Sequence, residues 1–424
     1  MAEARRFLGL GELRPLSREE HKFAGEICAK IGDLARSRPV GAGVTASFAR
    51  PDGDWEVDAH NKWFFDICRL VVSGDYDAIN LLRLYSEAFS GYDLKTKSFA
   101  PFIPPGEVCE KPRFRISPTS ADEIRDAWMQ QPDSWVERFR RITRHLPRWV
   151  VKQAPARLGE IGWEVGGHPV NYDVYSCQER LNFLYEAGVL TRLKRKAAQG
   201  RRVTIVEIGA GYGALAEHLT RILTNACYIV CDIPESLLFA ALYLGILRGR
   251  AGHAIYDGGR AALHNLRSGF LFLPNFFFDD LVTAGIETDL AINTLSFGEM
   301  TEHQVRHYAH GLRAMLGDGG VLFEQNMDLR KFGWATPSEI LGEVFPYREE
   351  VRSRTVVERR TMGQPTLWAA SPIDAIIRRG FRPYEGIVWR TRFAAESFVR
   401  RGGRAAIRLV SHLRARLTEV RSRL

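Results

Sequence analysis

The sequence predicts an α/β protein with a doubly wound parallel sheet and a mostly helical N-terminal region. The first observation is an apolar run at 203–208 (VTIVEI), followed by glycines at alternate positions, Gly209, Gly211 and Gly213. The second is a helical spacing of apolar residues directly after them, so the stretch reads as a buried strand, a tight turn and a helix. The third is the recurrence of short apolar runs, with helical patterns between them, at 227–231, 269–274, 289–293 and 320–324.

The glycine turn is typical of a nucleotide-type cofactor site, and Glu207 indicates which cofactor. Gly209, Gly211 and Ala214 also satisfy the looser dinucleotide pattern G-x-G-x-x-G/A. A dinucleotide places its pyrophosphate at the helix N-terminus, where the Glu207 carboxylate would repel it. S-adenosylmethionine carries an ammonium and a sulfonium instead. Asp232, 25 residues after Glu207, is placed to accept the ribose hydroxyls. We therefore predict a methyltransferase; the alternative is an ordinary turn after a buried strand.

Length and composition agree with a protein of two or three domains and no membrane span. The chain has 424 residues, and 45% of them are hydrophobic. No signal peptide is visible at the N-terminus, and the longest uncharged apolar stretch, 237–247, is too short to cross a bilayer. The six cysteines show no CxxC spacing, so they read as reduced core residues and not as disulfide or zinc ligands. These features favour a cytoplasmic protein.

We expect three regions along the chain. Residues 1–150 form a helical N-terminal region, a cap or a homodimer interface, in which 62–72 and 76–89 have helical spacing. Residues 151–398 form the cofactor domain. Residues 399–424 form a basic amphipathic helix, with eight arginines and one glutamate between Arg400 and Leu424. This last helix either packs on the protein or a partner chain, or holds the protein peripherally at an anionic membrane surface on the inner face.

The stretch 158–190 is dense in side chains that bind polar ligands. They are Trp163, His168, Asn171, Tyr172, Asp173, Tyr175, Gln178 and Arg180. The periodicity predicts an amphipathic helix from Gln178 to Leu190, with Leu181, Leu184, Tyr185 and Val189 facing inward. The alternative interpretation is that the loop before this helix closes over the cofactor or presents the substrate.

The second half of the sheet is predicted with its connecting helices. Pro234 begins a helix over 235–247, and Asn275 follows the strand at 269–274. Thr301 and Gln304 form a capping box for a helix that carries His303, His307 and His310 on one face. Since this face lies opposite the apolar stripe, we expect solvated histidines and no metal site. Final strands are predicted at 366–369 and 387–391.

VEIGAGYGALAEHL resembles motif I of the class I S-adenosylmethionine-dependent methyltransferases. The wider set GEIGWEV, NYDVYSCQERLNFLYEAGVL, CDIPESL, FLPNFFFDDL and NTLSFGEMT is similar to the bacterial sugar O-methyltransferase family, over 158–389. The resemblance implies a Rossmann-like sheet, a sugar or glycan acceptor and a role in polysaccharide biosynthesis. It also implies cofactor contacts at Glu207, Gly209, Gly211, Gly213, Asp232 and Asn275. Tyr212, Ile233 and Asn293 complete the predicted cofactor-binding set.

Methyl transfer to a sugar hydroxyl needs in-line alignment and removal of the hydroxyl proton. Acceptors reach such a sheet at the carboxyl ends of its strands, where Asn293, Thr294, Glu299 and Glu324 fall. Glu299 is the first candidate base, followed by His168 and Asp173. The alternative for Glu299 is a solvated carboxylate near a helix N-terminus.

Two other functions stay open. The net charge of +9, with basic clusters at 138–141 and 192–196, is compatible with RNA methylation, but no nucleic-acid module is recognised, which argues against nucleic acid as a partner. A degenerate fold acting as a scaffold is the non-enzymatic alternative. The intact Glu207, glycines and Asp232 argue against it.

Overall fold

The computed structural model describes residues 6–39, 68, 71–73, 76–87, 134–250, 252–259, 262–263, 268–327, 336–353, 355–356 and 363–378. The chain divides into two compact units, 1–373 and 374–424. Of the second unit, 374–378 are described, as most of the short helix α16 (Ile373–Arg378). The predicted strand at 387–391 and the predicted basic helix at 399–424 lie outside the described residues.

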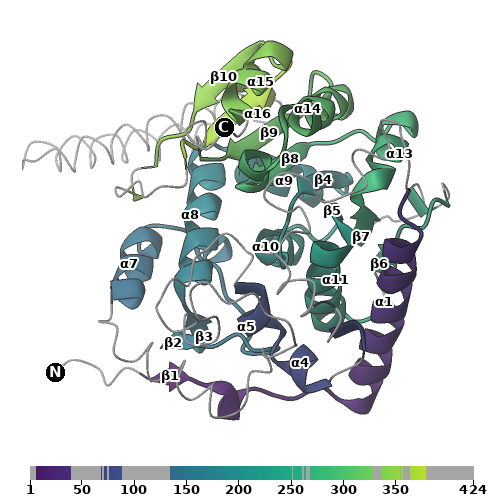
Figure 1. The fold of residues 1–424 in the computed structure, drawn as a ribbon. Coiled ribbons are helices and arrows are strands. Elements are labelled where there is room, and N and C mark those ends of the chain that lie inside the picture. The colour runs from purple at the N-terminus through teal and green to yellow at the C-terminus, as the bar shows by residue number, and fades with distance from the viewer. Residues whose placement is uncertain are drawn as a thin grey trace, which may run out of the picture. The chain divides into compact units, whose positions relative to one another are not determined.

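The first unit is built on one eight-stranded sheet with the order β10-β11-β9-β8-β4-β5-β7-β6 (Figure 1). Its strands are β4 (Val203–Ile208), β5 (Ala226–Asp232), β6 (His253–Ile255), β7 (Gly269–Pro274), β8 (Leu290–Thr294), β9 (Val321–Gln325), β10 (Tyr347–Glu350) and β11 (Thr366–Ala369). The pairs from β6 to β9 are parallel, and β11 is antiparallel to both β9 and β10. A parallel sheet with one reversed strand near its edge is the arrangement of the class I methyltransferase fold. The predicted fold class is confirmed.

The predicted strands agree closely with the observed ones. The bounds of β4, β7 and β11 are as predicted, and β5 ends at Asp232 as expected. Every residue of β4, β8 and β9 is buried, which explains their continuous apolar runs. The edge strands β6 and β10 were not predicted, because β6 has three half-buried residues and β10 reads YREE, with all four residues exposed.

Helices connect these strands and pack on them. They are α9 (Val189–Ala198), α10 (Ala214–Ile222), α11 (Pro234–Arg248), α13 (Phe278–Thr283), α14 (Glu302–Leu316) and α15 (Pro337–Val344), with the 3₁₀ helices η5 (Asn275–Phe277) and η6 (Ser296–Glu299). Pro234 occupies the first turn of α11 as predicted. Helix α9 contacts β4, α10 and α11 contact β5, and α14 contacts β8 and β9.

The capping box of α14 is confirmed. Thr301 accepts a hydrogen bond from the Gln304 backbone, and the Gln304 side chain accepts one from the Thr301 backbone. His303 and His310 are exposed, as expected, whereas His307 is half-buried with its Nε2 2.8 Å from Asp279 Oδ1. Within the described ranges, no group of histidine, cysteine or acidic side chains could hold a metal ion.

Two of the described N-terminal elements, α1 (Arg18–Arg36) and α5 (Leu82–Glu87), pack on helix α11 of the sheet. The others are β1 (Phe7–Leu8), η1 (Leu10–Glu12), α4 (Tyr76–Asn80), α7 (Ser134–Thr143) and η4 (Arg148–Val150). Helix α1 runs beside α11 (Figure 1), and Arg38, just after it, pairs with Glu235 on α11 at 2.5 Å. Helix α5 also contacts α11. Parts of 1–150 lie outside the described residues, and the boundaries at 150 and 398 stay predictions.

Helix α8 (Tyr172–Glu186) corrects the prediction for 158–190. It follows β2 (Gly162–Val165) and β3 (His168–Val170), which form a three-stranded sheet with β1. The helix begins six residues before Gln178, because the Asn171 side chain accepts a hydrogen bond from Val174 N at 2.8 Å and caps it. It is not amphipathic. Its buried polar side chains are Asp173, Ser176, Gln178, Arg180 and Asn182.

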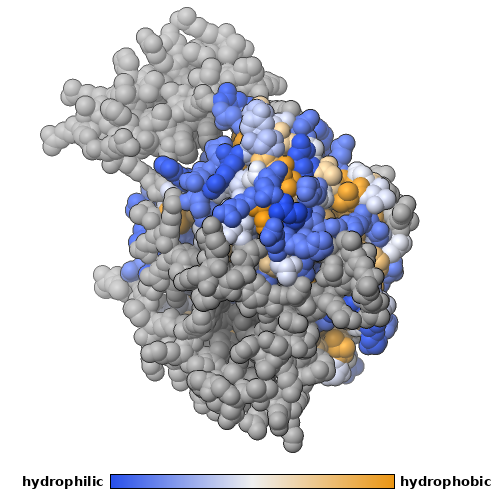
Figure 2. All heavy atoms as spheres, turned by 45° about the horizontal axis from the view of Figure 1, so that its top comes forward, coloured by the Kyte–Doolittle hydropathy of each residue, from blue (hydrophilic) through white to orange (hydrophobic). Residues whose placement is uncertain are grey.

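Two further expectations concern thiols and membranes. Cys28, Cys68, Cys177, Cys227 and Cys231 are buried free thiols, as predicted, and Cys109 lies outside the described residues. In the part of the chain that the structure describes, no helix combines the length and apolarity that crossing a membrane requires. On the face turned to the viewer in Figure 2, the described residues are mostly hydrophilic and the apolar ones form small separate groups.

Candidate cofactor site

The turn between β4 and α10 holds the three glycines in the left-handed region. Their φ values are +70° at Gly209, +56° at Gly211 and +90° at Gly213. A Cβ on Gly209 would lie 2.2 Å from Ser296 Oγ, and one on Gly213 would lie 2.7 Å from Leu244 Cδ1. Glycine is expected in such a turn where a ligand comes close to the backbone. At Gly209 and Gly213 the structure gives a second reason, which is close packing against η6 and α11.

Glu207, at the end of β4, is a buried carboxylate beside this turn. The residue is 3% exposed, and its Oε2 accepts a hydrogen bond from Tyr228 Oη at 2.6 Å. Burial raises the pKa of Glu207 to about 7, an effect that the Tyr228 hydrogen bond and the nearby Arg180 guanidinium oppose. Arg180, on α8, is buried as well, and burial lowers its pKa to about 10. The site therefore pairs a carboxyl group that titrates near neutral pH with a buried cation.

Asp232 ends β5, the strand next to β4, and ties the turn to α11. Its two oxygens accept hydrogen bonds from Ile233 N and Ser236 Oγ, both at 2.9 Å. The Gly211 backbone also donates to this carboxylate. Burial nevertheless raises the pKa of Asp232 to about 7. Two carboxyl groups with raised pKa values thus lie at the carboxyl ends of neighbouring parallel strands.

Asn293, at the end of β8, fixes the loop that meets the turn. Its Nδ2 donates to Ile208 O at 3.0 Å and to Ser296 Oγ at 2.6 Å. Its Oδ1 accepts from Phe297 N at 3.2 Å and from Asn326 Nδ2 at 2.9 Å. Since these four bonds use the capacity of the amide, Asn293 acts on the site by positioning η6. Its predicted contact with the cofactor stays a prediction.

Asn275 lies in η5, directly after β7, as the sequence placed it. The residue is buried, and its side chain forms a hydrogen bond with Tyr308 of α14. The carboxyl ends of β4, β5, β7 and β8 therefore carry Glu207, Asp232, Asn275 and Asn293 in the sheet order β7-β5-β4-β8. Four side chains of the predicted cofactor set share one edge of the sheet.

The three candidate bases lie in different surroundings. Glu299 ends η6, is half-buried, and is three residues from Ser296, which packs on Gly209. His168 begins β3, with its Nδ1 3.2 Å from Ala154 O. Asp173 is buried in the first turn of α8, and its Oδ2 accepts from Arg83 Nη2 at 2.8 Å. Of the three, Glu299 is the one on the loop that touches the glycine turn.

Sequence reasoning missed two arginines near the turn. Arg83 of α5 is 0% exposed, and its guanidinium carbon lies 3.2 Å from the centroid of the Tyr212 ring. Arg180 was noted as polar but was not assigned to the cofactor set. A lone arginine inside the apolar run LLRLY at 81–85 is the signal that could have indicated a buried charge.

Comparisons with known proteins give likeness of fold at low identity. No family model matches the sequence, and no curated protein matches it. Solved structures that resemble this chain include the bifunctional kinase-methyltransferase WbdD, at a TM-score of 0.31 and 14% identity over 55% of this chain and 46% of that one. Human methyltransferase-like protein 13 in complex with SAH gives a TM-score of 0.30 and 14% identity, over 46% of this chain and 90% of that one. Spermidine synthase from Thermotoga maritima gives 0.29 and 17%, over 48% and 64%. The matched part covers less than half of WbdD, and the fold assignment depends on the strand order given above.

Proposed function

We propose that this protein is an S-adenosylmethionine-dependent methyltransferase. The observation that carries the proposal is the pair of carboxyl groups Glu207 and Asp232, beside a glycine turn, with pKa values raised to about 7 by burial. Perturbed groups of this kind cluster at functional sites. A pyrophosphate would meet two anionic groups here, whereas a ligand with an ammonium and a sulfonium would stabilise their ionised forms.

The residues at the turn fit the three parts of this cofactor. Asp232 would accept from a ribose hydroxyl: a carboxylate has about four acceptor positions, and Gly211, Ile233 and Ser236 supply three donors, which leaves one position. Glu207 and Arg180 would receive the ammonium and carboxylate of the amino-acid part. Asn275 would lie beside the adenine. When bound, the cofactor supplies an electrophilic methyl group for in-line displacement.

For the acceptor we propose a hydroxyl of a sugar or glycan, which the resemblance of the later motifs supports. Glu299 is our first candidate for the base that removes its proton, because η6 lies against the turn at Gly209. Glu324, at 3% exposure, is the alternative: burial raises its pKa to about 6, and it accepts from Asn326 Nδ2 at 2.8 Å and Trp368 Nε1 at 3.3 Å. Asp173 is held by Arg83, which makes it a poorer base than either.

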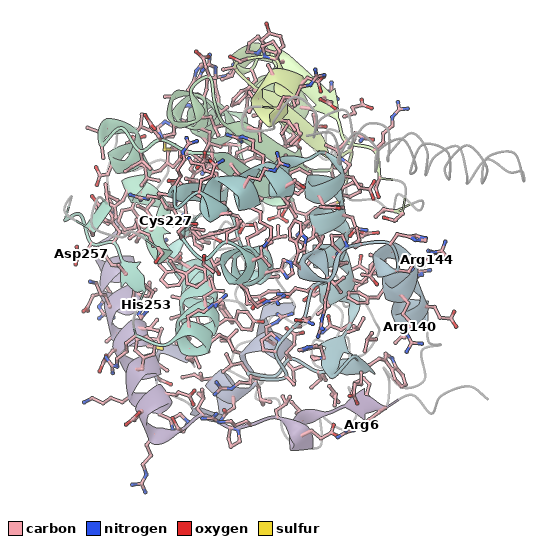
Figure 3. The ribbon with its side chains drawn as sticks, turned by 180° about the vertical axis from the view of Figure 1, so that it is seen from behind. Arg6, Arg140, Arg144, Cys227, His253 and Asp257 are labelled. Carbon is pink, nitrogen blue, oxygen red and sulfur yellow. The ribbon has the colours of Figure 1, made fainter. Side chains whose placement is uncertain are left out.

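RNA methylation has less support from the basic clusters than the sequence indicated. In the cluster at 192–196, Arg192 donates to Gly319 O at 2.6 Å and Lys196 donates to Asp289 at 2.6 Å, so both serve the packing of α9. Around α7, Phe139 is buried, while Arg140 and Arg144 are exposed and extend away from the helix (Figure 3). Arg141 is exposed as well, and these three arginines make a small surface for a phosphate backbone.

Transfer of a labelled methyl group tests the proposal and the choice of acceptor together. Full-length protein is incubated with S-adenosylmethionine carrying a tritiated methyl, and with mono- and oligosaccharides, sugar nucleotides or RNA in parallel. We expect label in a carbohydrate fraction, at an oxygen identified by mass spectrometry, and none in RNA. Label in RNA alone would contradict the sugar acceptor, and no transfer to any fraction from protein that binds the cofactor would favour the scaffold alternative.

A further inference from the structure

We propose that Arg83, from the N-terminal region, is a positioning residue of the cofactor turn, which it holds through the ring of Tyr212. The turn itself belongs to the cofactor domain, more than 100 residues later in the chain. The inference deepens the proposed function, since its affinity readout assumes that S-adenosylmethionine binds at this turn.

The first step is that the guanidinium of Arg83 is fixed in place. It is completely buried; Nε donates to Glu160 Oε2 and Nη2 donates to Asp173 Oδ2, each at 2.8 Å. The Arg83 backbone N–H donates to Leu158 O at 2.7 Å. Glu160 is held in turn by Asn171 Nδ2 at 2.6 Å. Backbone and side chain are therefore both anchored to the segment 158–160.

The second step is that this segment is shaped to receive α5. Leu158 has a φ of +57°, which is strained for a residue other than glycine. Gly159 has a φ of +84°, and a Cβ there would lie 3.0 Å from the backbone of Leu81. Such close contact leaves little freedom between α5 and the segment. The junction is built to hold Arg83 in one position.

The third step is the contact with the turn. The Arg83 guanidinium carbon is 3.2 Å from the centroid of the Tyr212 ring, and Tyr212 makes an edge contact with Tyr243 of α11 at 5.2 Å between centroids. Tyr212 stands between Gly211 and Gly213, which have little steric restraint of their own. A ring held by Arg83 and Tyr243 restricts the backbone of the glycine turn.

The chemistry requires arginine and not any cation. A planar guanidinium can stack on a ring and donate to two carboxylates at once, whereas the lysine ammonium is a compact charge with no plane. A desolvated cation–π contact is among the stronger ones of its kind. Arg83→Lys therefore keeps a positive charge near Glu160 and Asp173 and loses the stack.

A double-mutant cycle with S-adenosylhomocysteine tests the coupling. The variants are Arg83→Lys, Tyr212→Leu and the two combined, in the full chain, with dissociation constants from calorimetry. We expect each single variant to weaken binding about 10-fold, and the double variant to bind about as weakly as the weaker single one. Lys196→Met is the matched control: it breaks an ion pair of 2.6 Å with Asp289 at the other end of the sheet, so it should lower the melting temperature and leave affinity unchanged.

Hydrogen exchange provides a readout that does not need the cofactor. In ligand-free Arg83→Lys and Tyr212→Leu, the amides at 209–213 should exchange faster than in the parent, while those of β8 keep their rates. Additive losses in the cycle, or unchanged exchange in the turn of both variants, would overturn the inference. If the parent does not bind S-adenosylhomocysteine, the proposed function fails and the exchange comparison still decides the role of Arg83. If Arg83→Lys does not fold, Tyr212→Leu alone gives the exchange test.

Discussion

Buried carboxyl groups have different partners at the two ends of the sheet. At the amino end, Asp289 precedes β8, and its oxygens accept from Lys196 Nζ at 2.6 and 2.7 Å and from Thr204 N at 3.0 Å. At the carboxyl end, burial raises the pKa values of Glu207 and Asp232 to about 7 and that of Glu324 to about 6. Among the described residues, none of these three forms an ion pair.

The difference separates a structural carboxylate from the carboxyl groups that we propose to be functional. A buried carboxylate that is paired and hydrogen-bonded, as Asp289 is, fastens α9 to the sheet. A carboxyl group buried with neutral donors only is costly to ionise, and an apolar residue there would pack at lower cost. We propose that these three groups mark a site whose ligand brings a further cation, beside the Arg180 guanidinium that already lies near Glu207. In the Arg83 cluster, one arginine forms ion pairs with both Glu160 and Asp173. In their contacts these two carboxylates therefore resemble Asp289.

The largest expected effect is on turnover. Glu299→Gln keeps the shape of η6 and removes the proposed base, so we expect turnover to fall by about 100-fold or more with little change in cofactor affinity. Steady-state rates with the acceptor identified by the transfer assay measure it. Glu324→Gln is made in parallel. If that variant loses turnover and Glu299→Gln keeps the parent rate, the base is Glu324.

The next effect is on cofactor affinity, and it compares the two ends of the sheet directly. Asp232→Ala removes the acceptor of a ribose hydroxyl, and hydrogen bonds to a charged group contribute about 1.5–3 kcal/mol each, so affinity for S-adenosylhomocysteine should fall about 100-fold. Asp289→Asn should instead destabilise folding by about 1–3 kcal/mol, because Lys196 loses its charged partner, and leave the dissociation constant within error. If both variants weakened cofactor affinity equally, the proposed difference between the two ends of the sheet would be wrong.

The position of the sheet and its turn could be predicted from sequence because they depend on local patterns. Continuous apolar runs gave β4, β7 and β11 with correct bounds, and Asp232 at the end of β5 followed from its place after such a run. Strand β10 could not be found, since its four residues are exposed and polar. The start of α8 was missed because the Asn171 cap lies before a helix whose buried face is polar.

The contacts around the turn could not be predicted for a different reason. Arg83 meets Tyr212 across more than 100 residues of chain, and no local pattern encodes such a pairing. The same holds for Ser296, whose approach to Gly209 is set by the hydrogen bonds of Asn293. From the sequence we could name the proposed cofactor residues at the strand ends, but not the groups that hold them in place.

A smaller effect is the pH dependence of the carboxyl end. Ligand-free Glu207 and Asp232 take up protons below about pH 7, and a bound cation favours their ionised forms, so binding releases protons and tightens as pH rises. We expect S-adenosylmethionine to bind about 10-fold more tightly at pH 7.5 than at pH 5.5. For each proton released on binding, the logarithm of the affinity changes by at most one unit per pH unit. Calorimetry in buffers of different ionisation enthalpy measures the released protons.

The stability of the ligand-free protein changes with pH in the opposite direction to cofactor affinity. The raised pKa of Glu207 means that the folded, ligand-free protein binds its proton more tightly than the unfolded chain does. This contribution to stability is present below about pH 4.5, the ordinary value, and is lost as pH rises through about 7. Glu207→Gln should flatten this part of the profile of melting temperature against pH. A variant profile parallel to that of the parent would show that Glu207 does not titrate in this range.

The most direct test of the central claim is calorimetry of the full chain with S-adenosylhomocysteine and with NAD⁺, repeated for Gly211→Val and Asp232→Ala. The account predicts that the parent binds S-adenosylhomocysteine and not NAD⁺, and that both variants, still folded by circular dichroism, lose most of that affinity. Binding of NAD⁺ without S-adenosylhomocysteine, or undiminished binding in both folded variants, would contradict the assignment of the carboxyl end of the sheet as a site for S-adenosylmethionine.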